Sequence, residues 1–321
     1  MKKSMILAAA LAAMTAGHAA AQNYPERAIT ILVPFAPGGV VDLASRTIGE
    51  GLSKKWGVEV IVENRAGGSG FIAATALAQS APDGYTLFMG EAGTMTINPS
   101  LFDQTPYDAE ADFTPISTVT DTPLILVANK EAPFSTMEDF LAAAKAQPGM
   151  ITYSSAGVGT LNHLAPEWMA LEAGITLQHI PYKGGRPAAT AVASGEVDVS
   201  VVSYSSTKPF IDSGDVVVLS TASGQRIAPS PETPTMQEAG VPNVDTSQWT
   251  GLMGRAGTPE PILDQLNAAV QEVLADPAVA ARLSEAGAAP FPSSRADFQA
   301  MLERLRGQFA TIIETADITP Q

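Results

Sequence analysis

Three short apolar runs in this chain each end in a glycine-rich turn that leads into a helix-forming segment. The turns lie at residues 36–39, 65–70 and 155–160. Glycine lets the backbone turn sharply and approach a ligand closely, and the helix start that follows leaves backbone N–H groups without partners. Such turns can hold an anion without a cationic side chain. Ordinary turn chemistry is the alternative interpretation of each turn taken alone.

The rest of the chain continues this alternation of strands and helices. Apolar, β-branched runs predict strands at residues 29–35, 58–63, 85–89, 124–128, 151–154, 197–204 and 216–221. Helix-forming segments lie between them or after them, at residues 41–55, 71–79, 137–146, 161–173, 261–275, 277–286 and 296–315. The alternation predicts α/β domains with largely parallel sheets. Ligands of such sheets bind outside the carboxyl ends of the strands.

The first 21 residues have the pattern of an export signal. Lys2 and Lys3 precede an apolar run that is too short to span a bilayer, and small residues at 19–21 offer a cleavage site. We therefore predict a signal peptide at 1–21, with an N-terminal anchor helix as the alternative. Of the 321 residues, 300 would remain, and this length suggests two domains.

Charge and cysteine content exclude several classes of protein. The net charge is −15, and it becomes −17 without the signal peptide because only Lys2 and Lys3 are lost. A chain this acidic, with no basic block, is not expected to bind nucleic acid. It has no cysteine, so disulfides, thiolate metal sites and a lipidated N-terminal cysteine are excluded. Only two histidines follow residue 21, and we expect no metal or cofactor.

Motifs along the whole mature chain resemble those of the Bug family, the TctC-like periplasmic solute receptors of tripartite tricarboxylate transporters. They are YPERAITILVPFAPGG at 24–39, VENRAGGSG at 62–70, APDGYTL at 81–87, SAGVGT at 155–160, PYKGG at 181–185 and AGTP at 256–259. The resemblance implies a two-lobed, type II periplasmic-binding-protein fold, in which each lobe is a mostly parallel sheet flanked by helices. The ligand cleft lies between the lobes. Lobe 1 would comprise 22–125 plus 250–321 and lobe 2 would comprise 126–249.

The resemblance also implies which residues face the ligand, a small carboxylate such as a di- or tricarboxylate or an aromatic acid. In the first loop these are Phe35, Ala36, Gly38 and Gly39, with Asp42 shaping the loop. In lobe 2 they are Ser154, Ser155, Ala156, Gly157, Thr160 and His163. We expect Ser155 and Thr160 to be hydroxyl donors. A packed or capping role is the alternative for His163.

Four positions depart from the family pattern and bear on the ligand. Glu91 either faces the cleft, where it would disfavour a second anion, or is a surface glutamate. Arg186 could pair with a carboxylate in a bidentate manner, or it is a solvated residue at a helix start. Ser203 and Tyr204 replace an acid or amide that is often found there, which weakens the case for an amino-acid ligand.

We therefore predict a monomeric periplasmic receptor, not lipid-anchored, that closes over a carboxylate and delivers it to the membrane permease subunits of a tripartite tricarboxylate transporter. A ligand-presenting partner of a two-component sensor is the alternative. A serine hydrolase that uses Ser205 and Lys208 is a third hypothesis, because these residues match Ser-x-x-Lys. No companion motif follows them, so we do not expect an enzyme.

Overall fold

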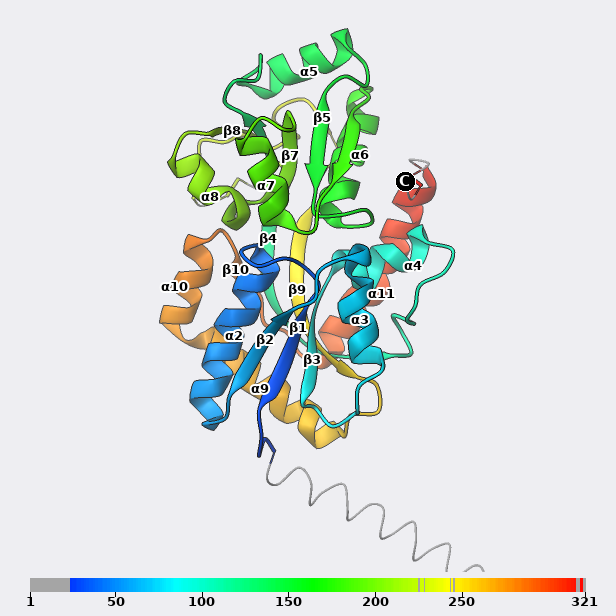
Figure 1. The fold of residues 1–321 in the computed structure, drawn as a ribbon, viewed down its shortest axis with the longest axis vertical. Coiled ribbons are helices and arrows are strands. Elements are labelled where there is room, and N and C mark those ends of the chain that lie inside the picture. Colours follow the sequence, from blue (N-terminus) through cyan, green and yellow to red (C-terminus); the bar gives the residue numbers. More distant parts are fainter. Residues whose placement is uncertain are drawn as a thin grey trace, which may run out of the picture.

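The computed structural model describes residues 24–224, 226–227, 229–242, 244, 246–315 and 318–319. The chain forms two lobes stacked end to end, with a waist where few segments cross (Figure 1). The predicted signal peptide at 1–21 lies outside the described residues. Among the described helices, none is both long enough and apolar enough to cross a bilayer.

Lobe 1 is built from the N-terminal and C-terminal parts of the chain. Its N-terminal elements are β1 (Ile29–Val33), α2 (Val40–Trp56), β2 (Val60–Asn64), η1 (Gly68–Gly70), α3 (Phe71–Ala78), β3 (Thr86–Glu91), η2 (Gly93–Ile97) and α4 (Asn98–Leu101). Its C-terminal elements are β9 (Ser247–Arg255), α9 (Glu260–Ala275), α10 (Pro277–Glu285), β10 (Ala289–Pro290) and α11 (Arg295–Thr315). The sheet runs in the order β2-β1-β3-β9-β4, where β4 is the strand Phe113–Asn129, and β10 pairs with β4.

Lobe 2 is formed by the middle of the chain. Its elements are α5 (Met137–Ala146), β5 (Thr152–Ser155), α6 (Leu161–Ala173), β6 (Gln178–Pro181), α7 (Gly185–Ala193), β7 (Val199–Ser203), α8 (Tyr204–Asp212) and β8 (Val216–Thr221). The strand β4 (Phe113–Asn129) enters this sheet between β7 and β8. Sequence patterns predicted neither α7 nor α8, and Tyr204 begins a helix where the sequence predicted the end of a strand.

The two long strands β4 and β9 connect the lobes. Residues 113–123 of β4 pair with β9 in lobe 1, whereas residues 124–129 pair with β7 and β8 in lobe 2. The chain thus changes sheets without leaving the strand, so β4 is continuous between the two lobes. The predicted lobe limits at 125/126 and 249/250 fall inside these two strands and stay a prediction.

Each sheet combines a parallel part with antiparallel crossover strands. The outer strands β1, β2 and β3 are parallel in lobe 1, as are β5, β6 and β7 in lobe 2. The largely parallel sheets expected from the sequence are found in these parts. The crossover strands β4 and β9 run in opposite directions between the lobes and pair antiparallel with each other. β9 also pairs antiparallel with β3.

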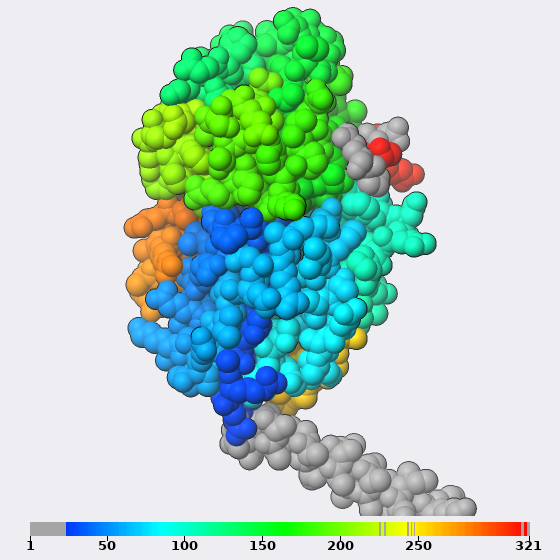
Figure 2. All heavy atoms as spheres, in the orientation of Figure 1, coloured from blue at the N-terminus to red at the C-terminus, as the bar shows by residue number. Residues whose placement is uncertain are grey.

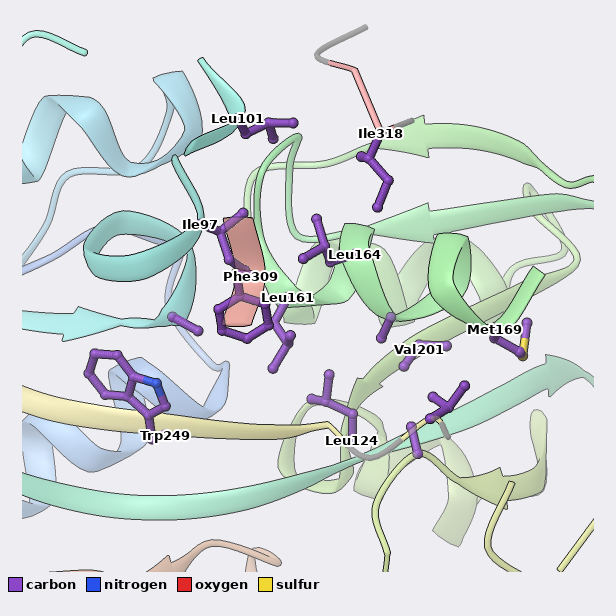
Figure 3. Packing of buried hydrophobic residues seen from close by; sticks show 14 of the residues in the cluster. Ile97, Leu101, Leu124, Leu161, Leu164, Met169, Val201, Trp249, Phe309 and Ile318 are labelled. Carbon is purple, nitrogen blue, oxygen red and sulfur yellow. The ribbon is translucent and has the colours of Figure 1, made fainter. Parts of the chain in front are cut away.

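One hydrophobic core continues from lobe 1 into lobe 2 along α11. Phe309 of α11 and Ile318, which follows that helix, belong to the same buried cluster as Leu161 and Leu164 of α6 (Figure 3). Separating the lobes on this side would expose that apolar surface to water, which is unfavourable. We therefore expect the lobes to move apart on the side away from α6 and α11.

Candidate functional site

A small cavity lies between the lobes, close to the crossover strands. Its volume is about 10 Å³, enough for roughly one water molecule. In the space-filling view, atoms of lobe 2 meet atoms of lobe 1 along the whole visible boundary (Figure 2). The cavity is lined by Phe35, Gly39, Val40, Val41, Asp42, Ala156, Asn162, Gly185, Ser203, Ser206 and Gln248.

The N-termini of three helices meet at this cavity. Gly39 caps α2, Gly184 caps α7 and Ser203 caps α8. A methyl group at Gly39 would lie 3.9 Å from the backbone nitrogen of Gly185 and 3.6 Å from Oγ of Ser206. Two of these helices belong to lobe 2 and one to lobe 1, so both lobes direct helix N-termini into the same space. Unpaired N–H groups and the positive ends of helix dipoles favour an anion there.

Of the residues that the structure describes, Asp42 is the one charged residue in the cavity lining, and its side chain is held inside its own lobe. Its carboxylate accepts hydrogen bonds from the Gly38 N–H at 3.0 Å and from the Asn64 amide at 2.9 Å, and it pairs with Arg46 at 2.9 Å. Burial by itself would raise the pKa of Asp42, but the hydrogen bonds from Arg46, Gly38 and Asn64 outweigh it and lower the pKa. Asp42 is thus ionised at neutral pH, and its carboxylate fixes the first glycine turn.

The first loop also contacts lobe 2 directly. The backbone N–H of Ala36 donates a hydrogen bond to the carbonyl oxygen of Lys183 at 3.0 Å. Gly184 packs against the same loop, because a methyl group on it would lie 3.2 Å from the Ala36 nitrogen. The N–H of Ala36, which was expected to face a ligand, is engaged between the lobes in this conformation.

An outer groove of about 270 Å³ adjoins the cavity. Phe35 and Ala156 line both spaces, so they separate the cavity from the groove. The other lining residues are Pro34, Gly67, Gly68, Ser69, Gly70, Gly157, Val158, Pro181, Tyr182 and Lys183. The second glycine turn and Gly157 therefore face this groove and not the cavity.

The remaining polar residues predicted in lobe 2 make hydrogen bonds within that lobe. The Ser154 hydroxyl donates to the Ala188 carbonyl oxygen at 2.9 Å, and the Thr160 hydroxyl donates to the Gly157 carbonyl oxygen at 2.7 Å. Oγ of Ser155 lies 2.7 Å from Nε2 of His179. These side chains shape the third glycine turn, and ligand contact by Ser155 and Thr160 stays a prediction.

His163 and His179 form a buried aromatic stack. Their ring centroids lie 4.2 Å apart, and Nδ1 of His163 accepts the Gly159 N–H at 3.3 Å. Burial lowers the pKa of His163 to about 4. Burial, together with the nearby His163, lowers the pKa of His179 to about 3. Both rings are neutral at pH 7 and support the turn at 155–160 from behind.

Glu91 is neither on the surface nor in the lining of the cavity. It is 1% exposed, and its carboxylate accepts the N–H groups of Gly93 at 2.7 Å and Thr94 at 2.8 Å. Burial raises the pKa of Glu91 although these hydrogen bonds oppose the shift. The glutamate therefore closes the turn after β3, and the interpretation as a surface glutamate is wrong.

Arg186 and Tyr204 both lie on the surface of lobe 2 that faces lobe 1, and each contacts a different glycine of lobe 1. Arg186 is half-buried beside the first loop, where a methyl group at Gly38 would lie 3.2 Å from its Nε. Tyr204 is buried and packs on the turn after α10, where a methyl group at Gly287 would lie 2.9 Å from its Cβ. Tyr204 does not line the cavity, whereas its neighbour Ser203 does.

Sequence reasoning did not assign six residues of the lining: Val40, Val41, Asn162, Gly185, Ser206 and Gln248. One signal was available, since Gly184 and Gly185 precede a helix as the other glycine turns do. Ser206 lies inside the Ser-x-x-Lys pattern at 205–208, which does not point to ligand binding. Asn162 and Gln248 carried no local signal, and only the packing of the lobes brings them to the cavity.

The residues of the hydrolase hypothesis are not arranged for catalysis. Nζ of Lys208 pairs with Asp212 at 2.8 Å on the surface, whereas Oγ of Ser205 lies 3.1 Å from Oγ of Ser203. The pair of Ser155 and His179 has the short distance of a nucleophile and its base. However, Nδ1 of His179 has no hydrogen-bond partner among the described residues, so no acid orients the ring. The described residues also contain no cluster of three or more His, Asp or Glu suited to a metal ion.

The comparison with known families decides the identity of this fold. A profile described as the tripartite tricarboxylate transporter family receptor, TctC, matches residues 44–318. The chain belongs to the TctC family. The resemblance to Bug and TctC-like proteins in the motifs is thereby confirmed.

Relatives with solved structures or names agree with this assignment. The chain is 35% identical to BugT of Bordetella pertussis over 86% of each chain. It is 31% identical to Rpa4515 of R. palustris, solved with adipate, with a TM-score of 0.90 and coverage of 93% of this chain and 100% of that one. It is also 31% identical to MatC from Rhodopseudomonas palustris with bound malate, with a TM-score of 0.86 and coverage of 90% and 100%.

The predicted type II two-lobed fold is confirmed by these structures and by the observed lobes. The TctC family consists of periplasmic solute-binding proteins, and this chain is a solute-binding protein of that family. The cavity between the helix N-termini is the candidate site at which it binds its solute.

Proposed function

We propose that this protein captures a small carboxylate between its lobes and delivers it to the permease subunits of a tripartite tricarboxylate transporter. The observation that carries this proposal is the convergence of the N-termini of α2, α7 and α8 on one cavity. Three helix N-termini offer several backbone N–H donors and a locally positive potential to a carboxylate. Hydroxyl groups of Ser203 and Ser206 lie at the same place.

Local attraction has to overcome the charge of the whole molecule. A net charge of −15 repels an anion at long range. Among the described residues, the cavity lining contains no lysine or arginine, and its one acid, Asp42, is compensated by Arg46 and two N–H donors. Binding through backbone N–H groups suits this setting, because these donors are fixed by the helices and need no long, flexible side chain.

The related structures support the carboxylate as the class of ligand. Rpa4515 was solved with adipate and MatC with malate, both dicarboxylates. This chain is 31% identical in sequence to each of them over the aligned residues and has the same fold. The glycine turns and helix starts that line its cavity come from the elements that form the cleft in a two-lobed receptor.

Capture requires the lobes to move. A cavity of about 10 Å³ is far below the roughly 300 Å³ or more of usual small-molecule sites. Opening would break the hydrogen bond from Ala36 to Lys183 and would bend the crossover strands β4 and β9. Closure around the ligand would then remake this contact, which is the usual hinge motion of periplasmic receptors.

Delivery places this cycle in the periplasm. A signal peptide at 1–21 would export the chain, which without cysteine cannot carry an N-terminal lipid on that residue. The folded receptor would act as a soluble monomer and needs no cofactor for capture. A permease subunit would recognise the closed form and receive the carboxylate when the lobes reopen.

Calorimetric titration and thermal unfolding test the proposal directly. A panel of mono-, di-, tri- and aromatic carboxylates should include at least one that stabilises ligand-free protein, by about 2.7 kcal/mol at 100 times its Kd. Ser206→Ala should then weaken binding by about 0.5–1.5 kcal/mol. Ser213→Ala, at the other end of α8, removes an exposed hydroxyl and should leave the affinity unchanged.

Two results would contradict this function. The first is that none of these acids, at concentrations up to millimolar, stabilises protein shown to be free of ligand. The second is that Ser206→Ala and Ser213→Ala weaken binding equally, which would place the bound acid away from the helix N-termini.

A further inference from the structure

Arg186 is a cation of lobe 2 that lies over the first loop of lobe 1. It is the second residue of α7, directly after Gly185 of the cavity lining. A methyl group at Gly38 would lie 3.2 Å from Nε of Arg186 and 3.4 Å from its Cγ. The side chain therefore lies between the lobes and next to Gly185 of the cavity lining, although Arg186 itself is not part of that lining.

The guanidinium group of Arg186 has no anionic partner among the described residues. No described carboxylate lies within 4.0 Å of it and no described side chain or carbonyl accepts a hydrogen bond from it. Its closest aromatic contact is the ring of Phe210, whose centroid lies 5.7 Å from Cζ. By contrast, the arginines beside the first two glycine turns, Arg46 and Arg65, are both paired with carboxylates.

An unpaired, half-buried guanidinium is energetically unfavourable. Arginine stays protonated in proteins, so burial removes water from a permanent charge without replacing the lost interactions. Burial accordingly lowers the pKa of Arg186. An anion bound next to it would offset this cost and could accept two parallel N–H bonds. The contact with the Phe210 ring offsets only a small part of this cost, and packing on Gly38 offsets none of it.

We propose that Arg186 is a specificity-determining residue that receives the second negative charge of the ligand. The inference rests on the proposed carboxylate binding and adds the class of ligand. One carboxylate binds at the helix N-termini, and Arg186 pairs with a second anionic group on the same molecule. The protein therefore selects dianionic acids over monoanionic acids of the same size.

The position of Arg186 couples this selection to closure. The residue belongs to lobe 2, and Gly38, which it covers, belongs to lobe 1. The two approach each other only when the lobes are closed. A second charge on the ligand thus stabilises the closed form specifically. A ligand shifts the equilibrium between open and closed lobes only if it interacts more favourably with one of the two forms.

Matched ligand pairs test the charge while keeping the size constant. The probes are succinate, glutarate and adipate, each compared with its monoamide by calorimetric titration at pH 7.5. A hydrogen bond to a charged group contributes about 1.5–3 kcal/mol, so the wild type should prefer at least one of the diacids over its monoamide by roughly 10- to 150-fold. Arg186→Gln should reduce this preference to within about threefold and leave the affinity for the monoamide unchanged.

Two further variants control for charge and for folding. Arg186→Lys keeps the charge but loses the planar fork, so it should retain part of the preference. Lys145→Gln removes one exposed charge from α5, at the far end of lobe 2 (Figure 1), and should leave the preference at the wild-type value. Thermal midpoints close to that of the wild type would show that every variant is folded.

The outcomes separate this inference from the proposed function. An unchanged preference in Arg186→Gln, or a wild type that binds diacids and monoamides equally, would overturn the role of Arg186 and leave carboxylate binding intact. If Lys145→Gln reduced the preference as much as Arg186→Gln did, the effect would be general electrostatics and the inference would be wrong. Absence of binding to all six probes and to the wider acid panel would overturn both proposals.

Discussion

The carboxylate of Asp42 accepts the backbone N–H of Gly38 at 3.0 Å, so the first glycine turn is closed by an acid from the helix that follows it. Gly38 has a φ of +94°, a conformation that side chains with a Cβ rarely adopt. The acid and the glycine together hold the turn against α7 of lobe 2. An anionic side chain thereby supports a site that is proposed to bind anions.

Asp42→Ala should lower the free energy of unfolding by about 1–3 kcal/mol, because the Gly38 N–H and the Asn64 amide lose a buried acceptor. The pKa of Asp42 is lower in the folded than in the unfolded chain. Its contribution is therefore complete at neutral pH and is lost as the pH falls through the lowered pKa of the folded protein. Urea unfolding of the wild type and Asp42→Ala at pH 7 and pH 3 should show that their difference in free energy of unfolding is smaller at pH 3. An equal difference at the two pH values would contradict this account.

Gly39→Ala should block the cavity while the fold remains intact. Gly39 has a φ of −86°, which alanine can adopt, and the methyl group would lie 3.6 Å from Oγ of Ser206. As an N-cap, alanine should cost at most about 1 kcal/mol of stability. Because the methyl group would occupy the space between the helix N-termini, affinity for the best acid of the panel should fall at least about tenfold. Calorimetric titration measures this, and an affinity equal to that of the wild type would move the acid elsewhere.

Alanine substitutions at two glycines in helix interiors should change the stability of the protein in opposite directions. A methyl group at Gly51 of α2 would clash with Cγ1 of Val273 of α9, whereas nothing lies within 4 Å of a methyl group at Gly307 of α11. Gly51→Ala should destabilise the protein by about 1–3 kcal/mol through overpacking. Gly307→Ala should stabilise it by up to about 1 kcal/mol through helix propensity.

Urea unfolding at pH 7 measures both effects. Adding Val273→Ala to Gly51→Ala should remove the clash, so the double variant should lose less stability than the two single changes together. Strict additivity of the two changes would show that close packing of α2 on α9 does not explain the requirement for Gly51.

Acid should destabilise the protein over a pH range that the pKa values of His163 and His179 determine. Burial lowers their folded pKa values to about 4 and about 3, against about 6.5 in an unfolded chain. Between these values the unfolded chain binds protons that the folded chain does not, so stability falls as the pH drops below about 6.5. Each histidine should contribute roughly 1–3 kcal/mol to the loss.

The matched variant is His163→Phe, in which an aromatic ring still stacks on His179 but cannot be protonated. As the pH falls from 7.5 to 4.5, its free energy of unfolding, measured with urea, should decrease less than that of the wild type. NMR titration of the imidazole signals should show no midpoint above pH 5 for either histidine in the folded protein. A folded-state midpoint near 6.5 would mean that the stack is accessible to water.

Elements with a strong local pattern were predicted closely. The helix at 161–173 has the predicted bounds, because Thr160 and Gly174 mark its ends and its interior is apolar. The first half of β4 was missed, since residues 113–123 are rich in Ser and Thr, contain Pro115 and Pro123, and show no alternation. This segment is a strand because β9 pairs with it, and β9 lies more than 120 residues away in the chain.

The sequence by itself determined the strand–helix alternation, the family motifs and the glycine turns from which an anion site could be built. Only the tertiary structure decided which helix starts meet. Of the three predicted turns, the first lines the cavity, the second faces the outer groove, and the third contributes Ala156 to both. The N-termini of α7 and α8 complete the cavity, together with Asn162 and Gln248. A turn's conformation depends on neighbouring residues in the chain, whereas the convergence of helix ends depends on how two lobes pack around shared crossover strands.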